Sequence, residues 1–448
     1  MTKPLSANFL KSPAGILALQ KIIALILAFS TTYLFIRFSS IDDFGSYAFS
    51  LAVVEIAAAF AGFGMSPLIV KHVASEYADP AYYAGLIDRT LANCFSVSGL
   101  LSFILGLIIT LLTFIIEPII WMSALVVPIT VLLDIRTAQL QGAKHPRFSQ
   151  LPTLVLRPAL IILIGFGAYE ATGKQLLASD LMLIYLVASV MTAALVYLFM
   201  RSRFFNMTRV PEEQSLQAEE VGNQYSRQEF LRDIRSLGIS SAGFRLTRYL
   251  DILILGFILP PSSIGLYKAG SQIAQFVAFG LQIGAVILAR EFAARSATGQ
   301  LHSLAPKLRT ASLSISSAAF IIYAVVIVVL GENILRVLTG SPAGEAYIIA
   351  LILGGGHLLS CVAGNQGLLL NMCGLHSVTA RWMIRTLVVH MFWVALLTFT
   401  LGLFGAAIGT AISVVFNNYG LTREARARLP VSTDLIFALS FKGKDLRR

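Results

Sequence analysis

Residues 180–200 read DLMLIYLVASVMTAALVYLFM, a stretch whose one charged residue, Asp180, stands at its start. About 20 predominantly apolar residues are enough to cross the ~30 Å hydrocarbon core of a bilayer as a helix. The stretch is continuously apolar rather than alternating, so it does not resemble a strand of an outer-membrane barrel. It therefore predicts a membrane-spanning helix.

Eleven further stretches of this kind occur in the 448 residues. The composition agrees, because 56% of the residues are hydrophobic and 13% are charged, with a mean hydropathy of +0.78. Soluble globular domains carry roughly 25% charged residues. We predict an all-α polytopic membrane protein with about twelve transmembrane helices, at residues 14–36, 46–68, 91–115, 118–138, 150–169, 180–200, 236–259, 264–289, 310–330, 345–370, 380–401 and 403–421.

The basic residues lie mostly at one set of span ends. With both termini placed in the cytoplasm, 26 of the 34 Lys and Arg residues fall on cytoplasmic segments or at the cytoplasmic ends of spans, three on outer segments and five deeper within spans. This asymmetry follows the positive-inside rule and indicates an even number of spans. The net charge of +11 is therefore explained by membrane topology, and we expect no nucleic-acid partner.

An internal repeat divides the chain near its middle. At an offset of 220 residues, Phe44-Gly45-Ser46-Tyr47 aligns with Ile264-Gly265-Leu266-Tyr267, and Arg89-Thr90 aligns with Arg309-Thr310. Duplicated halves are typical of transporters whose binding site lies between the repeats near the bilayer midplane. We predict two homologous six-helix bundles around a central cavity, with the domains 1–205 (N-terminal bundle), 206–235 (cytoplasmic linker), 236–421 (C-terminal bundle) and 422–448 (basic cytoplasmic tail).

Four basic residues within spans are candidate substrate-binding cations of that cavity. A charge inside a span is costly unless it faces water or a partner. Arg245 and Arg248 lie near the middle of span seven, Lys21 lies on a small and polar stripe of span one, and Arg157 precedes Pro158, which disfavours helical geometry at Arg157. The competing interpretation of Arg248 is an intrahelical pair with Asp251, three residues on, and it leaves Arg245 without an obvious partner. Snorkelling of Arg157 and helix packing around Lys21 are the competing interpretations.

The acidic residues deepest in spans are Glu55 and Asp251. They could couple transport to H⁺ or Na⁺, or they could simply neutralise nearby basic residues. Asp134 lies near a span end, and we expect no special role for it. No Cys/His set has metal-ligand spacing and no GK[ST] phosphate loop occurs, so neither a metal nor another bound cofactor is expected.

The segment Arg37–Glu76 reads RFSSIDDFGSYAFSLAVVEIAAAFAGFGMSPLIVKHVASE. It resembles the signature region of oligosaccharide flippases of polysaccharide and O-antigen biosynthesis. Those belong to the multidrug/oligosaccharidyl-lipid/polysaccharide exporter (MOP) superfamily, which shares the MATE-like fold. The resemblance rests on an Arg that ends span one, an acidic-Phe-Gly-x-Tyr turn at Asp43–Tyr47, and a glycine-containing end of span two followed by Lys71.

The resemblance implies that the chain flips an undecaprenyl-pyrophosphate-linked oligosaccharide from the cytoplasmic to the outer leaflet of a bacterial cytoplasmic (inner) membrane. It is not an enzyme on this interpretation. Its partners would be the lipid-linked oligosaccharide, membrane lipids, a polysaccharide polymerase and other glycan-assembly proteins. Lys21 and Arg245 are similar in location to the cavity cations of lipid II flippases.

Two other functions are compatible with the sequence. An ion-coupled drug or cation exporter of the same superfamily would need an acidic or aromatic cavity, whereas the mid-span charges are five basic against two acidic. A membrane oligosaccharide polymerase or ligase would be expected to carry a sizeable outer loop, and the longest predicted outer loop, 331–344, is short.

The charge asymmetry yields a direct test of topology. Single cysteines replacing Lys174 and Ser341 should react with a membrane-impermeant thiol reagent added to whole cells, because both positions lie in predicted outer loops. A cysteine replacing Gln224 should react only after the membrane is opened. Outside labelling at 224 would contradict the predicted placement of both halves.

Overall fold

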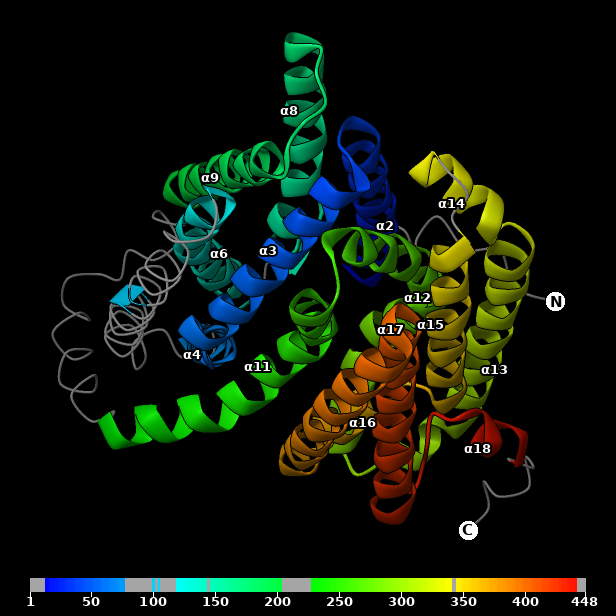
Figure 1. The fold of residues 1–448 in the computed structure, drawn as a ribbon. Coiled ribbons are helices and arrows are strands. Elements are labelled where there is room, and N and C mark those ends of the chain that lie inside the picture. Colours follow the sequence, from blue (N-terminus) through cyan, green and yellow to red (C-terminus); the bar gives the residue numbers. More distant parts are fainter. Residues whose placement is uncertain are drawn as a thin grey trace, which may run out of the picture. The chain divides into compact units, whose positions relative to one another are not determined.

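The computed structural model describes residues 13–76, 118–142, 146–203, 227–340 and 344–440, together with Gly99, Leu100 and Ile104. All regular elements of these residues are helices (Figure 1). Contacts divide the chain into two compact units, Met1–Tyr249 and Leu250–Arg448. The division falls inside helix α11 (Arg227–Ile258) rather than at the predicted linker, most of which lies outside the described residues.

Nine helices of the described part are long and apolar enough to cross a membrane. One of them, α17 (His376–Arg428), contains both of the last two predicted spans, because the chain turns at Gly402, whose φ is 60° and ψ −136°. Helix α11 occupies predicted span seven, but its charged and polar residues keep it less hydrophobic than the others. Span three, 91–115, lies almost wholly outside the described residues. The all-α, many-spanning fold is confirmed.

The first unit is built around one central helix. Helix α6 packs against α3, α4 and α9, and α2 packs against α8. The bounds of its elements are α2 (Pro13–Phe38), α3 (Ile41–Ala61), α4 (Met65–Glu76), α6 (Pro118–Gly142), α7 (Pro146–Ser149), the π-helical segment η1 (Pro152–Leu156), α8 (Arg157–Thr172), α9 (Ala178–Arg203) and the first part of α11.

The acidic-Phe-Gly-x-Tyr turn fixes where two helices begin. The Ser40 hydroxyl caps α3 by accepting a hydrogen bond from the Asp43 backbone N–H at 3.0 Å. One carboxylate oxygen of Asp43 accepts from the Ala178 N–H at the start of α9, also at 3.0 Å. Helix starts carry unpaired N–H donors, which carboxylates satisfy well. Tyr47, one turn further along, is buried, and its ring centre lies 5.1 Å from that of Phe35 in a T-shaped arrangement. The motif therefore has a structural role in joining α3 to α9.

A tight turn at Gly62–Gly64 breaks predicted span two into α3 and α4. Gly64 has a φ of +72°, and a Cβ there would lie 2.9 Å from the Gly238 backbone nitrogen of α11. A side chain is disfavoured by both the left-handed backbone and the close approach. The turn thus lets the first part of α11 lie directly against the backbone of the first unit.

The second unit repeats this plan. Its central helix α15 packs against α12 and α17, as α6 packs against α3 and α9. Helix α12 begins at Pro261 and α3 at Ile41, which is the offset of 220 seen in the sequence. The remaining bounds are α12 (Pro261–Ala297), η2 (Leu301–Leu304), α13 (Ala305–Ile322), the π-helical η3 (Tyr323–Val329), α14 (Gly331–Thr339), α15 (Gly344–Ala363), α16 (Gln366–Met372) and α18 (Leu435–Ser440).

Helix α17 is a hairpin of two packed halves (Figure 1). A Cβ at Gly409 of the second half would lie 2.8 Å from the Cα of Val394 in the first half, so glycine permits the contact. The Thr386 hydroxyl donates to the Asn417 side-chain oxygen across the hairpin at 3.0 Å. Small residues and polar side chains of this kind are what hold helices together in membranes.

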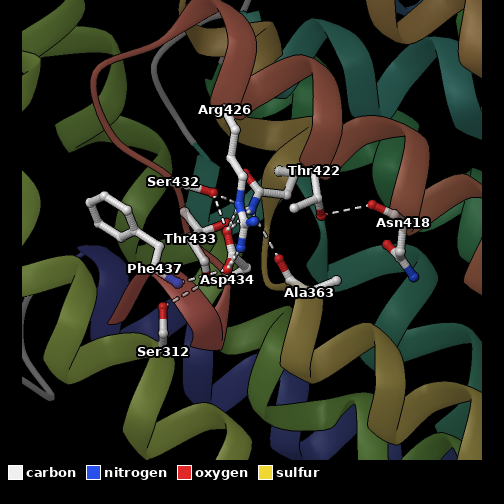
Figure 2. Close-up of polar contacts among 10 residues, drawn as sticks. Ser312, Ala363, Asn418, Thr422, Arg426, Ser432, Thr433, Asp434 and Phe437 are labelled. Atoms are coloured by element: carbon white, nitrogen blue, oxygen red, sulfur yellow. Dashed lines mark hydrogen bonds and ion pairs between the residues drawn. The ribbon is translucent and has the colours of Figure 1, made fainter. Parts of the chain in front are cut away.

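The residues after α17 form what we call the C-terminal strap, residues 429–440. The Thr433 carbonyl accepts from the Ser312 hydroxyl of α13 at 2.7 Å (Figure 2). The Ser432 hydroxyl accepts from the Gln366 amide of α16 at 2.7 Å. Ser432, Thr433 and Asp434 are each at most 3% exposed. Within the predicted tail 422–448, residues 422–428 therefore extend α17, and residues 429–440 pack on the second unit.

Asp434 is the anchor of the strap. Its carboxylate accepts from the Arg426 guanidinium at 2.5 and 3.1 Å and from the Phe437 backbone N–H at 2.8 Å. Burial alone would raise the pKa of this carboxyl, but the hydrogen bonds from Arg426, Ser432 and Phe437 outweigh burial and lower the pKa below its usual range. The ionised form is therefore the one that stabilises the fold.

Replacing Asp434 by Asn should destabilise the protein by about 1–3 kcal/mol, the cost of losing a buried charge-assisted hydrogen bond. Because the folded pKa lies below the unfolded one, the stabilisation is complete at neutral pH and is lost as pH falls through the usual Asp range towards the folded value. Thermal unfolding of the purified protein in detergent at pH 7 and pH 4 measures both effects. The matched control is Glu332→Gln, which removes an exposed i,i+4 pair with Arg336 and should change stability by less than about 0.5 kcal/mol. An equal loss in both variants would contradict an anchoring role for Asp434.

Candidate functional site

Three helices of the first unit bring opposite charges together inside the predicted membrane region. Arg245 of α11 donates to Asp134 of α6 at 2.5 Å, and its Nε lies 3.7 Å from a carboxylate oxygen of Glu55 on α3. The Glu55 side chain is 9% exposed, and those of Arg245 and Asp134 are each 26% exposed. Uncompensated charge is expensive at this depth. The two carboxylates compensate the charge of Arg245, and the three residues together join α3, α6 and α11.

The pairing of Asp134 with Arg245 differs from the sequence prediction, in which Asp134 had no special role and Arg245 had no obvious partner. Helix α6 continues to Gly142, four residues past the predicted span end, so Asp134 lies two turns inside the helix rather than near its end. Its role depends on which helix faces α11, and sequence spacing does not report that. The sequence did carry one indication: a mid-span arginine requires a nearby anion, and Asp134 lies within another predicted span.

The pair between Arg245 and Asp134 borders a cavity of about 410 Å³ in the first unit. Ser241 lines it from α11, and Thr137 and Gln141 line it from α6. Ser241 and Arg245 belong to the polar face that the sequence predicts for span seven. The cavity thus has hydroxyl and amide groups along its wall and a guanidinium–carboxylate pair at one position, a lining suited to polar or anionic ligands. That it binds substrate stays a prediction.

Arg157 lies at the start of α8, with its guanidinium carbon 5.1 Å from the centre of the Tyr185 ring on α9. The expectation that Pro158 disfavours helical geometry at Arg157 is wrong, because Arg157 has φ −60° and ψ −50°. The π-helical segment Pro152–Leu156 precedes it and accommodates the proline by widening the turn. Stacking on an aromatic ring is a common arrangement for Arg in a low-dielectric setting.

The other two predicted cations are less enclosed. Arg248 is exposed, with its guanidinium carbon 5.5 Å from the centre of the Phe244 ring. Lys21 on α2 is half-buried and within electrostatic reach of Arg248. Neither Lys21, Arg157 nor Arg248 forms an ion pair with the residues that the structure describes.

Asp251, the second predicted carboxylate, belongs to the second unit. It is 8% exposed and accepts a hydrogen bond from the Tyr267 hydroxyl at 2.7 Å, whose oxygen lies 3.2 Å from the Thr410 hydroxyl. The predicted pair of Arg248 with Asp251 is therefore wrong, since each has a different partner. Of the predicted site residues, the four cations and Glu55 belong to the first unit. Asp251 belongs to the second unit and is hydrogen-bonded to Tyr267.

Comparison with protein families gives a match to the family described as polysaccharide biosynthesis protein, over residues 10–283. A curated relative is the probable low-salt glycan biosynthesis flippase Agl15 of Haloferax volcanii, 24% identical over 182 residues. That alignment covers 40% of this chain and 38% of the relative, so it extends over about two fifths of either protein.

Solved structures with the same fold include two transporters of the MOP superfamily. An inward-facing multidrug resistance MATE family transporter matches with a TM-score of 0.65 at 16% identity, over 92% of this chain and 98% of that one. A transporter from Pyrococcus furiosus, described by the reverse polarity of its binding pocket, matches with a TM-score of 0.61 at 16% identity, over 93% and 95%. At this identity the similarity establishes the fold.

The two partners of Arg245 should contribute unequally to stability. Asp134→Asn removes a short, charge-assisted hydrogen bond and should cost about 1–3 kcal/mol. Glu55→Gln removes a longer contact and should cost less than about 1 kcal/mol, discounted for the partial exposure of Arg245. Thermal unfolding of the two purified variants, each with and without Arg245→Met, measures the coupling energies. A larger coupling for Glu55 than for Asp134 would contradict the observed geometry.

Proposed function

The chain belongs to the polysaccharide biosynthesis protein family, and we propose that it flips a lipid-linked oligosaccharide across a bacterial cytoplasmic membrane. The proposed substrate is an oligosaccharide joined to undecaprenyl pyrophosphate, moved from the cytoplasmic to the outer leaflet by alternating access. The family, the glycan flippase from Haloferax volcanii and the MOP transporter fold indicate a transporter rather than an enzyme.

The excess of basic side chains in the first unit carries the proposal. Among the described residues, Glu55 and Asp134 pair with Arg245, and no carboxylate pairs with Lys21, Arg157 or Arg248. The four basic side chains therefore outnumber their carboxylate partners by two. A pyrophosphate needs such charge in a low-dielectric site, and the planar guanidinium group can donate two hydrogen bonds to one phosphate. The hydroxyl and amide groups of the cavity wall would suit the sugars.

Binding by Arg245 requires an exchange of partners. Its guanidinium is held by Asp134 and Glu55, so a phosphate must compete with two carboxylates. Neutralising Asp134 or Glu55 with H⁺ or Na⁺ would weaken that competition and release Arg245 to the substrate. We therefore propose that these carboxylates couple substrate binding to one of the two ions, each carboxylate alternating between Arg245 and the ion.

The alternative within the same fold is an ion-coupled drug or cation exporter. An organic cation would bind the carboxylates themselves, so neutralising Glu55 and Asp134 would weaken its binding. For an anionic substrate the same change would strengthen binding. The two functions thus predict effects of opposite sign from one pair of substitutions. The polymerase, the other glycan-assembly partners and the cytoplasmic position of both termini stay predictions.

Arg245→Ala should abolish surface-glycan export while Arg245→Lys retains part of it, because the charge survives without the guanidinium fork. Loss of one charge-assisted contact should weaken binding by ~1.5–3 kcal/mol, or about one to two decades in affinity. Complementation of a flippase-deficient strain, with membrane abundance measured in parallel, provides the test. The control Arg309→Ala alters an exposed arginine outside the site and should export normally.

A binding measurement separates a substrate contact from a structural ion pair. In vesicles, Glu55→Gln/Asp134→Asn should bind undecaprenyl pyrophosphate more tightly than the unmodified protein, because Arg245 is released. Adding Arg245→Ala should remove that gain without leaving an unpaired carboxylate. Normal export by Arg245→Ala, or a triple variant that binds as tightly as the double variant, would show that Arg245 has only a structural role.

A further inference from the structure

The second unit carries an apolar groove that the charged cluster does not use. It has a volume of about 590 Å³ and lies between α15 and the second half of α17. Its walls include Gly355, Gly356 and Leu359 of α15 and Ile412 and Val415 of α17. None of its lining residues is charged. Its occupant must therefore be apolar where it touches these walls.

Two adjacent glycines make room in one wall of the groove. A Cβ at Gly356 would already lie 3.2 Å from the Cβ of Ala411, so the two helices approach closely at that point. An added Cβ at Gly355 would have one neighbour within 4 Å, the Tyr323 hydroxyl oxygen at 3.8 Å, which is an ordinary contact distance and no clash. The missing side chain of Gly355 gives the groove depth that a leucine or isoleucine would remove.

A cation stands beyond one end of the groove. Tyr419 lines that end, and Arg423 follows one helical turn later on α17, where positions four apart share a face. Arg423 is exposed and forms no ion pair with any described residue. The charge distribution of the sequence predicts that this end of α17 lies at the cytoplasmic surface. An apolar groove with a cation one helical turn beyond Tyr419 is complementary to a lipid chain that ends in a phosphate.

We propose that this groove docks the polyprenyl chain of the lipid-linked substrate in the cytoplasmic leaflet, with Arg423 contacting its phosphate. The inference rests on the proposed function and assigns the chain a place separate from the Arg245 cluster. Each isoprene unit carries a methyl branch, so a polyprenyl chain is thicker than a straight acyl chain and needs the room left at Gly355. Arg423 attracts the phosphate because the guanidinium is a good phosphate ligand.

Photocrosslinking in vesicles tests the site directly. A benzophenone amino acid replaces Leu359, which is 53% exposed in the groove, or Phe399, which is 82% exposed on the first half of α17 outside it. With trace radiolabelled undecaprenyl phosphate in phosphatidylglycerol vesicles, the groove position should be labelled about tenfold more. Labelled phosphatidylglycerol should show no such preference.

Matched variants identify the two halves of the site. Gly355→Leu should fill the groove and remove the preferential labelling, whereas Ala395→Leu, on an exposed position of α17, should not. Arg423→Gln should reduce labelling severalfold, and Arg309→Gln should leave it unchanged. Equal labelling at the two probe positions, or an equal groove preference for phosphatidylglycerol, would overturn the proposal.

The binding readout also keeps this inference apart from the proposed function. If the groove shows no preference while the unmodified protein still flips a glycan lipid in vesicles, only the docking proposal fails. If the groove takes undecaprenyl phosphate but no glycan lipid is flipped, the docking proposal stands and the proposed function fails.

Discussion

A charged side chain in the hydrocarbon region needs an opposite charge or water nearby. In the first unit this requirement applies to Arg245 and is satisfied by carboxylates on two other helices. Its guanidinium reaches Asp134 on α6 and Glu55 on α3, so one residue of α11 joins two other helices. The turn at Gly64 admits the same helix to close backbone contact. Electrostatic and steric requirements therefore agree, and they place the first part of α11 with the N-terminal unit, although the repeat assigns it to the second half of the sequence.

The two halves keep a common frame and differ in their polar contacts. Tyr47 and Tyr267 occupy equivalent positions of α3 and α12 and are both buried. Tyr47 packs its ring against Phe35, whereas the Tyr267 hydroxyl donates to Asp251. At the same offset the counterpart of Asp251 is Thr31, which offers no carboxylate. The tyrosine position is thus the same in the two halves, and only in the second half does its hydroxyl donate to a carboxylate.

Sequence reasoning predicted the helical fold, the duplication and the in-span charges, because hydrophobic length and charge cost act along the chain. It did not predict the partners. Pairing Arg248 with Asp251 used the only contacts that spacing can supply, those within one helix, whereas Arg245 meets Asp134 through tertiary packing. The strap was missed for a similar reason: Asp434 reads as one acid in a basic tail, and its burial depends on Arg426 and on the surfaces of α13 and α16.

The resting pairs around Arg245 also bear on how a flippase of this kind could release its cargo. A free arginine in a low-dielectric cavity would hold a pyrophosphate strongly, and a strongly held substrate leaves slowly. An arginine already held by carboxylates gains little net free energy on exchanging one anion for another, because desolvation and pairing are already complete. Binding is then weak enough to reverse on either side of the membrane, and its direction can be set by whatever neutralises the carboxylates. On the proposed function, the acidic partners would matter as much for release as the basic residues do for capture.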